Sequence, residues 1–141
     1  MGYAIFIVII LVFFTILVHL LALKTIYFSL TKNIFHPMIQ IGLSVYILIV
    51  SHFIEVVIFA IGFYIATEYA ESGLLKGDFT GDFREYIYFS LVSYTSLGIG
   101  DVYPYGPIRL LAGIEALTGL LMIGWSASIT YFCMHKVWFN K

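Results

Sequence analysis

The chain has 141 residues, of which 62% are hydrophobic, 18% aromatic and only 11% charged, and its formal net charge is −1. Soluble domains carry about 25% charged residues, so a soluble enzyme or a nucleic-acid-binding protein is not expected from a chain this apolar. The single cysteine excludes an internal disulfide framework and a metal site built from cysteines.

Three long apolar segments predict membrane-spanning helices. Residues 3–23 reach about 31 Å as a helix, close to the hydrocarbon thickness of a bilayer. Residues 38–66 and 108–134 are longer, about 43 and about 40 Å, so these helices must tilt or protrude. Because lipid offers backbone amides no other partner, all three should be α-helices. The predicted fold class is an all-α integral membrane protein with three transmembrane helices.

A fourth apolar segment, residues 83–94, is too short to cross a membrane, at about 18 Å as a helix. Asp82 and Glu85 form an aspartate variant of the capping box at its start. Gly98 and Gly100 follow its end, where a helix does not continue easily. The pattern predicts a re-entrant half-helix followed by an extended segment.

Charged residues gather at opposite ends of the predicted helices. One end carries four lysines and no acid: Lys24, Lys32, Lys136 and Lys141. The other end carries six acids and three basic residues: Glu68, Glu71, Asp78, Asp82, Glu85, Asp101, Lys76, Arg84 and Arg109. Since Lys and Arg concentrate in cytoplasmic loops, we expect a multi-pass protein of the plasma membrane or bacterial inner membrane. Its N-terminus should lie outside and its C-terminus in the cytoplasm.

The segment after the half-helix carries the most specific motif of the chain, Thr95-Ser96-Leu97-Gly98-Ile99-Gly100-Asp101. This stretch resembles the selectivity filter of tetrameric potassium channels, whose familiar form is TTVGYGD. The similarity continues forward into Val102-Tyr103-Pro104 and back to Tyr88-Phe89-Ser90 in the half-helix. It covers roughly residues 38–134, so the first span is an addition to the minimal two-helix plan.

The resemblance divides the chain into two parts. Residues 1–37 are an N-terminal transmembrane helix with its cytoplasmic connection, and residues 38–141 are a pore domain. The pore domain would comprise an outer helix at 38–66, an extracellular loop at 67–82, a pore helix at 83–94, a selectivity filter at 95–101, an inner helix at 108–134 and a short cytoplasmic tail.

In such a filter, rings of backbone carbonyls replace the water around a potassium ion. By analogy the ion-binding residues are Ser96, Leu97, Gly98, Ile99 and Gly100, with Thr95 and Asp101 supporting the filter and its outer mouth. Consecutive carbonyls point to one axis only if backbone conformations alternate in hand, and glycine takes the left-handed ones at little cost. One chain holds one filter segment, so the resemblance implies a homotetramer around the pore.

The resemblance thus implies a passive potassium channel in a lipid bilayer, with no nucleic-acid partner. It implies no enzymatic activity, and no cofactor or metal other than potassium ions at the filter. Ile99 stands where the family has tyrosine, and it cannot make the hydrogen bond that tyrosine makes behind the filter. Two alternatives therefore stay open: a weakly selective cation channel, and a non-conducting membrane subunit that assembles with a different protein.

Histidine and glutamate residues lie inside the predicted spans. His52 and Glu55 share a helix face, and Glu115 lies at a similar depth on the last span. We expect them to form a polar network behind the filter, as a structural brace or as a pH-sensitive gate. Metal binding by His52 with the carboxylates is a third alternative. His19 is expected about 13 Å from His52 along the membrane normal, so a direct pair is not predicted.

The last span is rich in small residues. Gly119 and Gly124 are candidate hinges of a flexible inner helix, and Ser128 is a candidate cavity residue below the filter. The alternative is that these small residues only allow close helix packing.

Overall fold

The computed structural model describes residues 2–32 and 36–139. It contains four helices, α1 (Gly2–Lys32), α2 (Pro37–Glu68), α3 (Phe83–Tyr94) and α4 (Ile108–Phe139), and two strands, β1 (Leu74–Gly77) and β2 (Val102–Tyr105). Helices α1, α2 and α4 are long and apolar enough to span a membrane. The predicted plan of three spans and one half-helix is confirmed, and the half-helix has the predicted bounds.

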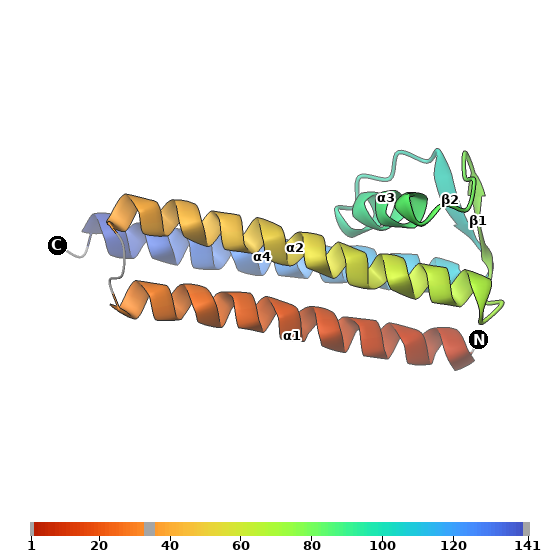
Figure 1. Ribbon diagram of the computed structural model, residues 1–141, viewed down its shortest axis with the longest axis horizontal. Helices are drawn as coiled ribbons and strands as arrows, with labels where there is room; N and C mark the ends of the chain where they lie inside the picture. The colour runs from red at the N-terminus through yellow and green to blue at the C-terminus, as the bar shows by residue number, and fades with distance from the viewer. Residues whose placement is uncertain (1, 33–35, 140–141) are drawn as a thin grey trace.

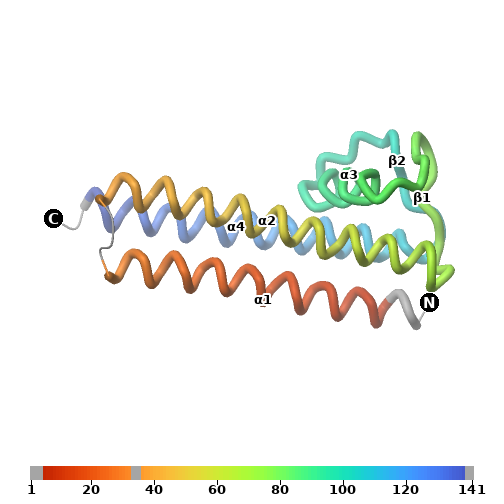
Figure 2. The backbone as a smooth tube through the Cα atoms, viewed as in Figure 1, coloured from red at the N-terminus to blue at the C-terminus, as the bar shows by residue number. Residues whose placement is uncertain are grey.

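The three long helices run side by side, and α3 lies with the two strands at one end of this bundle (Figure 1). Helix α1 begins at that same end, and α1 and α4 end at the other, where α2 begins (Figure 2). The chain therefore leaves α2 at one end of the bundle, forms α3, and enters α4 at the same end. This is the path that a re-entrant segment requires.

Two of the long helices continue past their predicted C-terminal ends. Helix α1 continues to Lys32 instead of residue 23, and α4 continues to Phe139 instead of residue 134. The hydroxyl groups of Thr25 and Thr31 bond to the carbonyls of Leu21 and Phe28 in their own helix. Polar residues after the apolar run therefore do not end α1, because their side chains are satisfied by the helix itself.

The bundle has a main core at the end that holds α3. Phe59 and Phe63 of α2 pack there with Tyr86 and Phe89 of α3. The rings of Phe63 and Phe89 pack edge to face, with their centroids 4.9 Å apart. Leu11 of α1 belongs to the same core. Helices α1, α2, α3 and α4 thus share one hydrophobic interior.

A smaller core lies at the other end of the bundle. It contains Ile26 and Leu30 of α1, Leu48 of α2 and Cys133 of α4. Lys136 Nζ also donates to the carbonyl of Leu30 at 3.0 Å, which ties the end of α4 to the last turns of α1. Helix α1 is therefore packed against α2 and α4 at both ends of the bundle.

The two short strands form an antiparallel pair that the sequence did not predict. Gly77 pairs with Val102, and Leu75 with Pro104. A Cβ atom at Gly77 would lie 1.9 Å from the carbonyl oxygen of Asp101, so this approach of the two backbones requires glycine. The pair joins the loop before α3 to the segment that follows residues 95–101.

Candidate functional site

The start of α3 is fixed by acidic side chains. Asp82 Oδ1 accepts a hydrogen bond from the amide of Arg84 at 3.2 Å. The carboxylate of Glu85 accepts from the hydroxyl and amide of Thr80 and from the amide of Gly81. These bonds from Thr80 hold the pKa of Glu85 below its ordinary value. The predicted cap is confirmed, except that the Glu85 carboxylate bonds to Thr80 and Gly81 instead of the amide of residue 82.

The end of α3 leads directly into the predicted filter segment. The amides of Ser96 and Leu97 donate to the carbonyls of Ser93 and Val92, at 2.9 and 3.0 Å. The hydroxyl of Thr95 donates to the carbonyl of Leu91 at 2.8 Å. These bonds close the last turn, and the chain then leaves the helix as extended backbone.

The backbone of residues 96–100 alternates in hand. Ser96, Gly98 and Gly100 have φ angles of 57°, 58° and 88°, whereas Leu97 and Ile99 between them are not left-handed. The two glycines adopt the conformations expected of them. Ser96 was not expected to do so; a left-handed conformation costs a residue with a Cβ atom about 1–2 kcal/mol. Such local strain is typical of functional segments.

The carbonyl groups of this segment are free of internal partners. Within the part of the chain that the structure describes, no backbone amide or side chain donates to the carbonyl oxygens of residues 96–100. Residues 96–100 are all exposed on the single chain, so these carbonyl oxygens are not covered by other parts of it. They are available as ligands for a cation.

Asp101, which follows the segment, accepts three hydrogen bonds. Its Oδ2 accepts from the hydroxyl of Tyr88 in α3 at 2.6 Å, and its Oδ1 from the amide of Val102 at 2.9 Å. Its carbonyl accepts from the amide of Asp78 at 3.0 Å. The bond from Tyr88 is the main reason why the pKa of Asp101 lies below its ordinary value.

Helix α4 approaches the inner end of α3 very closely at Gly119. A Cβ atom there would lie 2.0 Å from the carbonyl oxygen of Tyr94 and 3.0 Å from its ring. Gly124 has no such neighbour within 4 Å, and the exposed hydroxyl of Ser128 bonds to its carbonyl at 3.1 Å. Within the single chain, Gly119 therefore has a packing role that Gly124 lacks.

Glu115 lies on α4 behind the middle of α3 and is fully buried. The hydroxyl of Ser90 is 2.5 Å from Glu115 Oε1 and 2.7 Å from the carbonyl oxygen of Val56. One hydroxyl hydrogen cannot serve both acceptors fully. Ser90 and the Val56 carbonyl are both satisfied if the Glu115 carboxyl is protonated and donates from Oε1 to Ser90, which in turn donates to Val56. Glu115 Oε2 has no hydrogen-bond partner among the described residues.

A second polar cluster lies nearer the end of α3. Tyr94 donates its hydroxyl to Glu55 Oε2, and the same hydroxyl is 2.9 Å from His52 Nδ1. Ser51 donates to Glu55 Oε1 at 2.9 Å, and His52 Nε2 is 2.9 Å from the hydroxyl of Ser126 on α4. Hydrogen bonds do not link this cluster to Glu115 among the described residues. The expected single network is therefore two separate groups.

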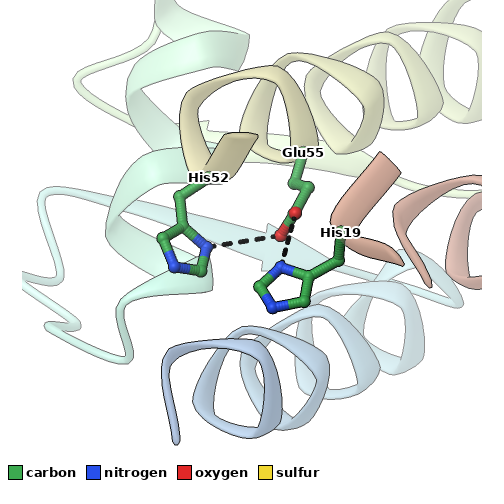
Figure 3. Close-up of side chains that lie close together, drawn as sticks. All are labelled: His19, His52 and Glu55. Atoms are coloured by element: carbon green, nitrogen blue, oxygen red, sulfur yellow. Dashed lines mark hydrogen bonds and ion pairs between the residues drawn. The ribbon is translucent and has the colours of Figure 1, made fainter. Parts of the chain in front are cut away.

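The expectation that His19 lies far from His52 is wrong. Their ring centroids are 5.4 Å apart, and His19 Nδ1 is 3.0 Å from Glu55 Oε1 (Figure 3). The estimate of about 13 Å counted from a helix end at residue 23, but α1 continues to Lys32. The longer helix brings His19 to the depth of His52.

Sequence reasoning did not place His19, Ser51, Tyr94 and Ser126 in the cluster around Glu55, nor Tyr88 beside Asp101. Tyr94 and Tyr88 both lie on α3. Their hydroxyl partners, Glu55 and Asp101, lie 39 and 13 residues away along the chain. The one available signal was Glu55, a carboxylate inside an apolar span, which needs hydrogen-bond donors.

Comparison with known proteins gives one match. A protein-family model described as "Ion channel" matches residues 51–134, from the second half of α2 through α3 and residues 95–101 to α4. No curated protein and no solved structure matches the chain. The matched region leaves out α1.

Proposed function

The chain belongs to a family of ion channels, and from this premise we propose that it conducts potassium ions passively through a filter made by four copies. The observation that carries the proposal is the segment of residues 96–100. Its carbonyls have no internal partners, and its backbone alternates in hand. A potassium ion that sheds its water needs replacement oxygens, and stacked rings of carbonyls supply them.

The proposed ion ligands are the carbonyls of residues 96–100, with the Ser96 hydroxyl at the inner end. A single chain supplies one wall of such a path, so several copies are needed to surround an ion. The side chains of Leu97 and Ile99 support this, because they are 67% and 58% exposed on the single chain. Large apolar side chains beside a filter are expected to be covered by neighbouring subunits.

In this proposal the end that holds α3 faces the outside and the lysine-bearing end faces the cytoplasm. The acidic side chains at the outer end would concentrate cations near the mouth. The inner end of α3 would direct its negative dipole towards the ion path. Tyr88 would hold Asp101 and so fix the outer end of the filter.

A second candidate is a cation channel with weak selectivity. It is favoured by Ile99, whose side chain cannot donate a hydrogen bond that would hold the filter at a fixed width. The two candidates differ in the ratio of potassium to sodium permeability, not in architecture.

The test is ion flux from the purified protein in liposomes. We expect potassium flux that barium blocks, with sodium flux much smaller, and a mass in detergent equal to four chains. Equal potassium and sodium fluxes would favour the second candidate. Tetramers that carry neither ion, under conditions where a control channel conducts, would contradict both candidates and leave a non-conducting subunit.

A further inference from the structure

Three metal-ligating side chains converge inside the bundle, behind the inner end of α3 (Figure 3). His19 comes from α1, and His52 and Glu55 come from α2. His19 Nδ1 lies 3.0 Å from Glu55 Oε1, and His52 Nδ1 lies 3.4 Å from Glu55 Oε2. One ligand atom from each of the three residues lies within 4.8 Å of the others.

We propose that His19, His52 and Glu55 bind one divalent transition-metal ion of the zinc class, which links the added first helix to the pore domain. Imidazole nitrogen and carboxylate oxygen are ligands that zinc prefers. At zinc–ligand distances of about 2.0–2.1 Å, the ligand atoms of a tetrahedral site lie about 3.3 Å apart. The observed separations of 3.0 and 3.4 Å are close to this value but go to different oxygens of Glu55. The three ligand atoms lie within 4.8 Å of one another, so the side chains must move closer together to share one ion.

The surroundings of His52 favour this use. Its Nε2 lies 2.9 Å from the Ser126 hydroxyl, which can accept the Nε2 hydrogen and leave the lone pair of Nδ1 facing Glu55. Histidines that bind metals commonly donate their second ring nitrogen to such a partner. The ring of His19 packs against Trp125 at a centroid distance of 5.5 Å, which holds its orientation.

A fourth ligand is at hand in Tyr94. Its hydroxyl is 2.9 Å from His52 Nδ1 and bonds to Glu55 Oε2. Two neutral imidazoles, one carboxylate and one phenolate would balance the two positive charges of the ion, which matters in a membrane interior. Binding then releases the proton of the Tyr94 hydroxyl, as metal ions do when they replace ligand protons. The hydrogen of the neutral His19 ring moves from Nδ1 to Nε2, which has no hydrogen-bond partner among the described residues.

The ion also has a route to the site. His19 and Glu55 are fully buried, but the side chain of His52 is 20% exposed. A cavity of about 260 Å³ opens beside it, lined by His52, Tyr94, Thr95 and apolar residues of α2, α3 and α4. Since Tyr94 is the last residue of α3, a bound ion would connect α1 and α2 to the inner end of the pore helix.

The test is zinc binding by the full-length protein in detergent, after removal of metals with a chelator. We expect one zinc ion per chain by equilibrium dialysis, proton release on binding, and tetrahedral absorption bands when Co²⁺ replaces zinc. His19→Ala should weaken zinc binding by more than about tenfold. The matched control replaces the other two histidines of the chain, His36 and His135, by alanine and should leave binding unchanged.

Wild-type protein that retains no zinc would overturn the proposal, and so would zinc binding that disappears in the His36→Ala/His135→Ala control. If His19→Ala does not fold, Ser126→Ala replaces it, because that change removes the support of His52 and no ligand. Ser126→Ala with unchanged zinc affinity and unchanged Co²⁺ bands would also count against the site. None of these measurements depends on conduction, so their failure would leave the proposed function standing.

Discussion

Replacing Gly119 by alanine is expected to disturb the filter from behind. The new Cβ atom would lie 2.0 Å from the carbonyl oxygen of Tyr94, about 1.4 Å short of ordinary contact at 3.4 Å. A backbone oxygen cannot rotate away as the end of a side chain can, so α4 and the inner end of α3 must separate. Overpacking of this kind costs about 1–3 kcal/mol.

The matched control is Gly124→Ala, five residues further along α4. Nothing lies within 4 Å of a Cβ atom there in the single chain, and alanine favours the helix over glycine by about 0.8–1.0 kcal/mol. Gly119→Ala should therefore lower the thermal stability of the protein in detergent and reduce potassium flux in liposomes. Gly124→Ala should leave stability unchanged or raise it. Equal stability and equal flux in the two variants would refute the reasoning.

Three further predictions concern Asp101, the buried acids and the filter glycines. The hydrogen bond from Tyr88 lowers the pKa of Asp101 below 3.8, so the stability that this bond provides is complete above pH 3.8 and is lost as the pH falls through the lowered pKa. The free energies of unfolding of wild type and Tyr88→Phe should therefore differ at neutral pH and become equal in acid. Glu115→Gln should preserve thermal stability, because a neutral amide can donate to Ser90 as the protonated acid does. Glu55→Gln should lower the free energy of unfolding by about 1–3 kcal/mol, because its amide NH₂ group would face hydrogen-bond donors such as the Ser51 hydroxyl. Gly98→Ala should reduce potassium flux while tetramers still form, because a Cβ atom at a φ of 58° costs about 1–2 kcal/mol although nothing lies within 4 Å of it.

Each of these predictions has an outcome that contradicts it. A stability gap between wild type and Tyr88→Phe that persists unchanged below the lowered pKa would show that the hydroxyl does not act through the Asp101 carboxylate. Glu115→Gln less stable than Glu55→Gln would reverse the assignment of donors and acceptors. Gly98→Ala with wild-type flux would mean that the left-handed conformation at this position is not needed for conduction.

The long helices and the half-helix could be predicted because their signals are local. Apolar length decides whether a helix can span a bilayer, and residues 83–94 began and ended as the Asp82 cap and the following glycines indicated. The alternating backbone of residues 96–100 was predicted from Gly98 and Gly100, yet the left-handed Ser96 was not. Serine at that position does not indicate it, because a left-handed conformation is unfavourable for a residue with a Cβ atom.

The sequence could not predict how the helices are positioned relative to one another along the axis of the bundle. His19 meets Glu55 only because α1 extends to Lys32, and the apolar run alone ends at residue 23. The pairing of β1 with β2 was missed for a related reason, since each strand has four residues and its partner lies across α3. Contacts between distant segments depend on where each element ends, and a single sequence defines those ends least well.

The central claim is that the carbonyls of residues 96–100 surround an ion path shared by four chains. The most direct measurement is a crystal structure of the protein in thallium or rubidium, with anomalous scattering used to locate the ions. The account predicts a line of ion peaks on the fourfold axis, each between successive rings of these carbonyls. Peaks that are absent from the axis, or carbonyls that bond to their own chain and not to an ion, would contradict it.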